Sequence, residues 1–232
     1  MTHQPTNKKS PGCIGIIMDG NRRWARAHGK LPMEGHAAGY DKLKHMLRWA
    51  EEAGISYVIL YAFSSENWNR TPEEVSYLMK LLIRACRDEV EEFKKENARI
   101  RVIGERNRLS EDVREAIGYA EEETKHCTGA TLVLAISYGG REELVEAARK
   151  LSGRPPEEIT KETFTEALWT AGMPDPDLII RTSGEQRLSG FLLWQAAYSE
   201  LFFTETLWPD FSKEEFWEIL KTYADRERRF GK

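Results

Sequence analysis

The feature that most constrains this chain is a short apolar segment, Ile14–Met18, which ends abruptly at Asp19 and Gly20. Apolar runs of this length, bounded by turn residues, are typical of a buried strand in a parallel sheet. Arg22 and Arg23 follow at once, so the strand would bring a carboxylate and two guanidinium groups to one loop. Ligands of α/β proteins bind at such strand ends, and these groups suit a divalent cation and phosphate. The alternative is an ordinary turn with solvated arginines.

A second strand end of the same kind favours the ligand interpretation. The apolar run Leu178–Ile180 leads directly into Arg181, and Arg187 and Ser189 follow in a glycine-containing loop. We expect these three side chains to form a second anion cradle, because guanidinium groups bind phosphate oxygens well. Two cradles and one carboxylate suited to a metal ion predict a reaction between two phosphorylated substrates.

Polar residues also follow a third expected strand, Tyr57–Phe63. Ser64 and Asn67 would orient a substrate oxygen or relay a proton, and Trp68 would wall an apolar ligand. The alternative here is a plain turn before a capped helix. His36, at the start of another helical pattern, is a candidate phosphate donor near the cradles, although a lone histidine is more often structural.

Composition excludes several classes of function. The formal net charge of −4 lacks the basic excess of a nucleic-acid-binding protein. No stretch approaches the ~20 apolar residues of a membrane span, and residues 1–10 are polar, without the apolar core of a signal peptide. We expect residues 1–10 to be a disordered tail. The three cysteines form no Cys-x-x-Cys motif, and an odd number without a signal peptide favours the reducing cytoplasm over disulfides or structural zinc.

Apolar runs bounded by turn residues alternate with helical patterns along most of the chain. This alternation predicts an α/β fold in which residues 11–232 form a single domain, with a central, mainly parallel, six-stranded sheet flanked by helices. The expected strands are Ile14–Met18, Tyr57–Phe63, Ile100–Ile103, Thr131–Ile136, Leu178–Ile180 and Leu201–Phe203.

One expected helix is unusually long and has a wide apolar face. It begins after Thr71, with Pro72 at its first position and Glu74 three residues after the cap, and the pattern continues to about Glu96. Core packing is one interpretation of the apolar face. The other is that this face also lines an elongated apolar tunnel.

Several longer motifs occur in order along the chain. They are Ile17-Met18-Asp19-Gly20-Asn21-Arg22-Arg23-Trp24-Ala25, Gly35-His36, Tyr61-Ala62-Phe63-Ser64-Ser65-Glu66-Asn67-Trp68-Asn69-Arg70, Tyr138-Gly139-Gly140-Arg141, Arg181-Thr182-Ser183-Gly184-Glu185, Arg187-Leu188-Ser189, Phe191-Leu192-Leu193-Trp194-Gln195, Ser199-Glu200-Leu201, Leu207-Trp208-Pro209-Asp210-Phe211 and Arg229-Phe230-Gly231. With these motifs the chain resembles the cis-prenyltransferases, in particular undecaprenyl diphosphate synthases, over nearly its whole length beyond Ser10.

The resemblance implies a Mg²⁺-dependent enzyme that adds isopentenyl diphosphate units to farnesyl diphosphate with cis double bonds. It implies catalytic roles for Asp19, Ser64 and Asn67, and Mg²⁺ ligation by Asp19 and Glu200. It further implies a homodimer in which a subunit's chain end reaches across to its partner. The substrate-binding residues implied are Gly20, Asn21, Arg22, Arg23, Trp24, His36, Trp68, Arg70, Arg181, Arg187, Ser189, Arg229 and Gly231.

The resemblance also leaves alternatives open. The expected product is a long, undecaprenyl-type polyprenyl diphosphate held in the apolar tunnel, and its chemistry suggests peripheral contact with a membrane. A short- or medium-chain enzyme of the same chemistry is one alternative, and a non-catalytic scaffold subunit of a heteromeric synthase is a less favoured one. Pro32 departs from the family, which usually has a phosphate-binding arginine there. The small Ala130, near the expected far end of the tunnel, permits a long product.

Overall fold

A six-stranded sheet with every strand parallel forms the centre of the computed structural model, which describes residues 10–226. The spatial order of the strands is β3-β4-β2-β1-β5-β6. This confirms the predicted α/β class and all six predicted strands. Their bounds are β1 Cys13–Ile17, β2 Tyr57–Ser64, β3 Arg99–Ile103, β4 Thr131–Tyr138, β5 Leu178–Arg181 and β6 Glu200–Phe203.

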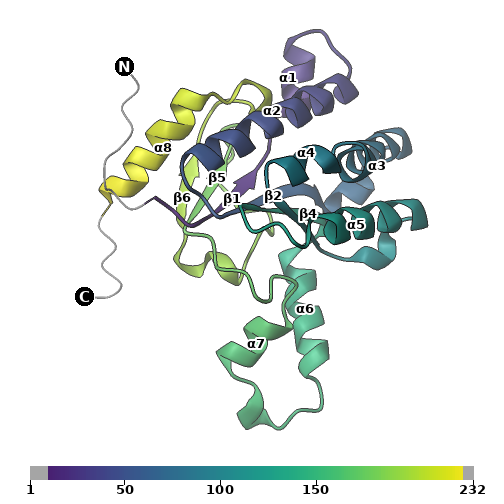
Figure 1. The fold of residues 1–232 in the computed structure, drawn as a ribbon, viewed down its shortest axis with the longest axis vertical. Helices are drawn as coiled ribbons and strands as arrows, with labels where there is room; N and C mark the ends of the chain where they lie inside the picture. The colour runs from purple at the N-terminus through teal and green to yellow at the C-terminus, as the bar shows by residue number, and fades with distance from the viewer. Residues whose placement is uncertain (1–9, 227–232) are drawn as a thin grey trace.

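Helices cover the two faces of the sheet unequally (Figure 1). One continuous core joins α2, α3, α4, α5 and α8 to one face, whereas α6, α7 and irregular segments lie on the other side. None of the helices within residues 10–226 combines the length and apolar character needed to cross a membrane. The helices are α1 Asn21–Ala27, α2 Pro32–Glu52, α3 Pro72–Arg87, α4 Val90–Lys95, α5 Glu111–Thr124, α6 Gly140–Leu151, α7 Lys161–Ala167 and α8 Lys213–Asp225.

The register of the central strands decides where the polar loops meet. β1 lies between β2 and β5, and every residue of β1 is buried because both faces of the sheet are covered. Ile17, the last residue of β1, pairs with Arg181, the last residue of β5. The loops that follow these two strands therefore leave the sheet side by side, at the same edge.

The prediction of one long helix from Pro72 to Glu96 is wrong in one respect, because two helices, α3 and α4, occupy this segment. At the break, the Glu89 carboxylate accepts a hydrogen bond from the Tyr40 hydroxyl at 2.5 Å and lies 2.7 Å from Lys44 Nζ, both on α2. Arg84 Nε lies 3.3 Å from the same carboxylate. Contacts with a neighbouring helix thus hold Glu89 outside helical geometry, which the periodicity of one segment does not reveal.

The Glu89 carboxylate should contribute measurably to stability. Glu89→Gln removes the charge that three donors share, so we expect the free energy of unfolding to fall by about 2 kcal/mol, the scale of hydrogen bonds to a charged group. Urea unfolding should show a lower midpoint at unchanged slope. Glu91→Gln is the matched control: its side chain is 61% exposed, and the change should stay within about 0.5 kcal/mol. Equal effects of the two variants would contradict this role.

The same carboxylate predicts a pH dependence. Burial opposes its ionisation, but the hydrogen bonds from Lys44 and Tyr40 outweigh burial and lower the pKa of Glu89 below its ordinary 4.5. Its contribution is therefore complete above pH 4.5 and is lost as the pH falls through the lower, folded-state value. The stability difference between the parent protein and Glu89→Gln should shrink in acid, and a difference that grows in acid would contradict the assignment.

Candidate active site

An ion pair between Asp19 and Arg181 stands at the centre of the site. Arg181 Nη2 lies 2.8 Å from Asp19 Oδ2, and the Arg181 side chain is only 5% exposed. Thr182 holds the backbone of Asp19, since its hydroxyl accepts from Asp19 N–H at 3.0 Å and donates to Asp19 O at 2.7 Å. Burial opposes ionisation of Asp19, but hydrogen bonds from Arg181 and Ser183 and the nearby Arg charges outweigh it, so the pKa of Asp19 lies below its ordinary value. The carboxylate is therefore charged at neutral pH.

The other end of the same guanidinium group organises the second cradle. Arg181 Nη1 donates to the Ser189 hydroxyl at 2.8 Å and to the carbonyl oxygen of Arg187 at 2.5 Å. The Arg187 side chain is 59% exposed and pairs with Glu185. The structure thus brings Arg181, Ser189 and the backbone of Arg187 together and joins them to Asp19 through one side chain, and the anion cradle itself stays a prediction.

The first cradle is a cationic hollow of about 730 Å³ beside α1. Arg23 is anchored there, because Nη1 donates to the carbonyl oxygen of Ser183 at 2.9 Å and Nη2 lies 3.7 Å from Asp19 Oδ2. Pro32, the departure noted above, lines the same hollow, as do the cationic side chains of Arg26 and Lys30. The polar and charged residues that line it are Asp19, Asn21, Arg22, Arg23, Arg26, Lys30, His36 and Arg70.

A buried polar group forms the inner wall of this hollow. The Glu74 carboxylate lies 2.9 Å from His36 Nε2 and accepts from Arg70 Nη1 at 3.0 Å. Burial lowers the pKa of His36 below its ordinary 6.5, the charges of Arg70 and Arg22 add to this, and Glu74 opposes it. His36 is therefore neutral at neutral pH, and its Nε2 is engaged by Glu74.

Close packing of α1 against α2 positions Asn21 at the junction of the site. Gly35 and Gly39 allow this approach, since a Cβ atom at these positions would lie 2.2 Å from Asn21 O and 2.4 Å from Asn21 Oδ1. Asn21 Oδ1 is buried and has no hydrogen-bond partner within the part of the chain that the structure describes. Unpaired buried oxygens are uncommon in folded proteins, and this one lies beside the cationic hollow.

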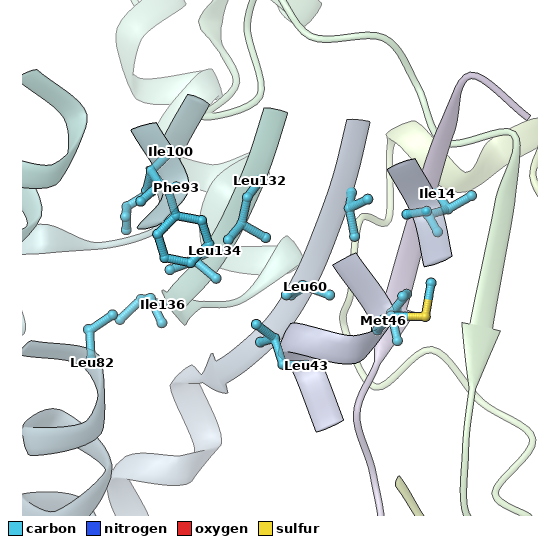
Figure 2. Close-up of a cluster of buried hydrophobic side chains, with 14 of the residues drawn as sticks. Ile14, Leu43, Met46, Leu60, Leu82, Phe93, Ile100, Leu132, Leu134 and Ile136 are labelled. Carbon is cyan, nitrogen blue, oxygen red and sulfur yellow. The ribbon is translucent and has the colours of Figure 1, made fainter. Parts of the chain in front are cut away.

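An apolar cavity of about 170 Å³ opens from the first cradle and runs between α2, α3 and the sheet. Met18, Asn21, His36 and Arg70 line both spaces, so a charged group in the cradle can continue directly into an apolar chain in the cavity. Figure 2 shows part of its wall, with Leu82 of α3 facing β4. Labelled residues that line the cavity are Leu43, Leu82, Phe93, Ile100, Leu132, Leu134 and Ile136.

A second, smaller cavity lies beyond the far end of the first. The two share Phe93 and Leu132, and the second is also lined by the small side chains of Ala98 and Ala130. Glu96 lines it as well, and burial is the main reason that the pKa of this carboxyl is raised. Phe93 and Leu132 thus form a partition, and beyond it space remains at the amino-terminal end of β4.

The third group of predicted residues is only partly brought to the site. Asn67 lines the apolar cavity, and its Oδ1 accepts from Ser64 N–H at 3.1 Å, which closes a short 3₁₀ turn after β2. Trp68 does not line the cavity. Its indole N–H donates to Ser137 at 2.9 Å, and the guanidinium group of Arg108 covers its ring. Trp24, on α1, donates to Asp210 at 2.7 Å.

The structure does not bring Glu200 to Asp19 within one chain. Glu200 pairs with Leu178 at the start of β5, whereas Asp19 follows the opposite ends of the strands. Glu200 is ion-paired with Arg226 instead. Arg229 and Gly231 lie outside the described residues. Within residues 10–226 no group of three or more His, Cys, Asp or Glu side chains is gathered to hold a metal ion.

Sequence reasoning missed three contributors to the site. Glu74 was interpreted as part of a helix cap; Thr71 does accept from Glu74 N–H at 3.3 Å, but the Glu74 carboxylate turns to His36 and Arg70. Arg26 lies one turn after Arg22 on α1, a spacing that could have identified it. Tyr61, which lines the apolar cavity, looks in the sequence like any strand tyrosine.

Comparisons with known proteins show which family the sequence and the fold resemble. A model of the undecaprenyl diphosphate synthase family matches residues 17–231. An isoprenyl transferase of Rhizobium meliloti is 52% identical, over 95% of this chain and 92% of its own length. An isoprenyl transferase of Thermotoga maritima is 45% identical, over 95% of this chain and 97% of its own length. The crystal structure of lavandulyl diphosphate synthase from Lavandula x intermedia, in complex with dimethylallyl diphosphate, superposes with a TM-score of 0.92 and 38% identity, over 96% of this chain and 99% of that one. The crystal structure of a probable undecaprenyl diphosphate synthase from Campylobacter jejuni superposes with a TM-score of 0.80 and 37% identity, over 97% of this chain and 100% of that one.

The His36–Glu74 contact makes a prediction that needs no substrate. Glu74→Gln removes the negative charge that raises the pKa of His36, so the ring should titrate at a still lower pH than in the parent protein. A pH titration of the His36 ring by NMR measures this directly. Glu73→Gln, which changes the exposed neighbour in the same helical turn, should leave that titration unchanged. A higher midpoint in Glu74→Gln would contradict the arrangement.

Proposed function

Because the chain belongs to the undecaprenyl diphosphate synthase family of cis-prenyltransferases, we propose that it condenses isopentenyl diphosphate units onto farnesyl diphosphate to make a long polyprenyl diphosphate. One observation carries the proposal: a cationic cradle opens into an apolar cavity, and a second anion cradle is joined to it through Arg181. Such a site accommodates one substrate with a diphosphate head and a long hydrocarbon tail, next to a second, smaller diphosphate.

The allylic substrate occupies the first cradle and the cavity. Its diphosphate lies against Arg22, Arg23 and Arg70, whose guanidinium groups pair with phosphate oxygens, and its tail extends past Met18 between α2, α3 and the sheet. Burial of the tail supplies binding energy at roughly 25 cal/mol per Å² of apolar surface. The isopentenyl diphosphate binds at Arg187 and Ser189, with Arg181 holding this loop beside the first cradle.

The reaction needs a stabilised leaving group and exclusion of water. The allylic C–O bond breaks, the isopentenyl double bond forms the new C–C bond, and one proton leaves the adjacent carbon. Negative charge grows on the departing diphosphate, so the guanidinium groups of Arg22, Arg23 and Arg70 bind the transition state more strongly than the ground state. Apolar walls keep water from the developing allylic cation. Asn67, which lines this end of the cavity, and the adjacent Ser64 orient the substrates for loss of the proton.

The donor set of the first cradle fits Mg²⁺. Asp19 is charged at neutral pH and 32% exposed, and magnesium is commonly held by one or two carboxylates together with substrate phosphates and water. Bound there, the ion would neutralise charge on the leaving diphosphate. The cradle arginines hold the diphosphate in line with the cavity entrance, and Asp19 would hold the ion beside it.

A long product is favoured over a short one by the space at the far end of the cavity. From Ile136 near the entrance to Ala130 beyond Leu132, the chain advances six residues, or roughly 20 Å of strand. Ala98 and Ala130 leave room past the partition formed by Phe93 and Leu132. We expect a cytoplasmic enzyme, and because the released product is mostly hydrocarbon, we expect it to make peripheral contact with a membrane.

We expect the enzyme to act as a homodimer. β6 is an edge strand of the described sheet, and near it Tyr198 is 83% exposed and Leu201 is 37% exposed. Open edges with exposed apolar side chains favour pairing with another chain. A dimer through this edge would also account for Glu200, which its own chain keeps away from Asp19.

Replacing Asp19 tests the metal and leaving-group assignment. We expect Asp19→Ala to lower turnover of farnesyl and labelled isopentenyl diphosphates by about 10³-fold, with a modest loss of farnesyl diphosphate affinity, because the carboxylate acts mainly on the transition state. Thermal unfolding of both proteins controls for loss of structure. Turnover within tenfold of the parent enzyme would contradict the role.

Replacing Ala130 tests the length assignment. Ala130→Leu fills the second cavity, so the product ladder, separated by chain length, should shift to shorter chains while consumption of the first isopentenyl unit stays unchanged. Ala148→Leu, on the exposed side of α6, is the matched control. An unchanged ladder in Ala130→Leu would mean that the chain does not extend this far.

A further inference from the structure

We propose that Tyr61 is a positioning residue: its hydroxyl holds the Ser189 turn (residues 188–192) in place and thereby sets how tightly the second cradle binds the incoming isopentenyl diphosphate. This rests on the proposed function, which assigns that cradle to the isopentenyl substrate. Tyr61 belongs to β2, and the turn is far from it in the sequence, so only the folded chain brings them together.

The hydroxyl group of Tyr61 joins two parts of the backbone. Its oxygen lies 3.2 Å from the carbonyl oxygen of Ser189 and 3.2 Å from that of Tyr138, at the end of β4. With one proton, it donates to these two acceptors alternately or shares the proton between them. Next to it, Gly140 N–H donates to the carbonyl oxygen of Gly190 at 2.8 Å. The consecutive turn residues Ser189 and Gly190 are thus tied to Tyr61 of β2 and to Gly140 at the start of α6.

The ring of Tyr61 is held independently of its hydroxyl. It stacks on Phe191 with ring centroids 4.8 Å apart and planes inclined by 17°, and it meets Tyr138 edge-on at 5.9 Å. Phe191 is fully buried. A phenylalanine at position 61 would keep these ring contacts, so the hydroxyl can be removed without opening the core.

The turn needs such support because its backbone is unfavourable. Ser189 has φ of 49° and Leu192 has φ of 48°, a region that side-chain-bearing residues seldom adopt, and Gly190 between them has φ of 79°. Conformations of this kind persist when surrounding contacts hold them. The Ser189 hydroxyl accepts a hydrogen bond from Arg181, and Arg187 lies two residues before Ser189. Any shift of the turn therefore moves the two anion-binding side chains of Ser189 and Arg187.

The hydroxyl of Tyr61 acts as a neutral donor. Burial is the main cause that raises the pKa of this tyrosine well above its ordinary 10, and Glu66 adds to the effect. Tyr61 therefore keeps its proton throughout the working pH range and does not serve as the base of the reaction. The Ser64 side chain also hydrogen-bonds this hydroxyl and opposes the rise in pKa, but the positioning role of Tyr61 lies in its hydrogen bond to the Ser189 turn.

The first test measures both substrates in Tyr61→Phe. We expect the KM for isopentenyl diphosphate to rise about fivefold, the effect of one hydrogen bond of ~1 kcal/mol, with kcat within twofold and the KM for farnesyl diphosphate unchanged. Tyr57→Phe makes the same change on the same strand, against the same side of the core, and should leave all three constants unchanged. An unchanged KM for isopentenyl diphosphate, or equal rises for both substrates, would overturn the proposal.

A double-mutant cycle tests whether Tyr61 acts through the turn. Ser189→Ala alone should raise the KM for isopentenyl diphosphate, and it should raise it less when Tyr61→Phe is already present, since the misplaced turn no longer presents that hydroxyl. Additive effects would overturn the proposal even if Tyr61→Phe were less stable. A parent enzyme that does not consume isopentenyl diphosphate would instead refute the proposed function, so the two failures are distinguishable.

Discussion

The contact between Arg181 and Asp19 organises everything else in the site. Arg181 is nearly fully buried, and its two terminal nitrogens are paired on opposite sides, whereas its Nε has no hydrogen-bond partner within residues 10–226. One side meets Asp19 after β1, and the other meets Ser189 and the carbonyl oxygen of Arg187 after β5. Since Ile17 pairs with Arg181 in the sheet, the register itself creates the contact. Arg181 thereby joins two loops, each carrying anion-binding side chains, and the contacts of Thr182 with Asp19 and of Arg23 with Ser183 reinforce the junction.

The second constraint is a cavity that the core leaves open. Protein interiors are normally packed without voids larger than a water molecule, and voids lower stability. Here the space is lined by apolar side chains, begins at the cationic cradle and continues toward Ala98 and Ala130. The unpaired Asn21 Oδ1 lies at its entrance. A diphosphate with a hydrocarbon tail would account for the cations and the cavity together.

Sequence reasoning predicted the features that depend on local pattern and on general rules of parallel sheets. The short apolar runs predicted all six strands, and the polar residues that follow two of them singled out Asp19 and Arg181, but not the ion pair that joins them. Features that depend on contacts between distant elements were missed. The helix break at Glu89 requires Tyr40 and Lys44 from another helix, and the placement of Glu200 depends on which end of β6 it occupies.

A crystal structure with both diphosphates bound would test the central claim most directly. Full-length protein would be crystallised with isopentenyl diphosphate and a non-hydrolysable analogue of farnesyl diphosphate. The account predicts the analogue's diphosphate against Arg22, Arg23 and Arg70 with its tail in the apolar cavity, and the second diphosphate at Arg187 and Ser189. Both diphosphates in one cradle, or a tail lying outside the cavity, would contradict it.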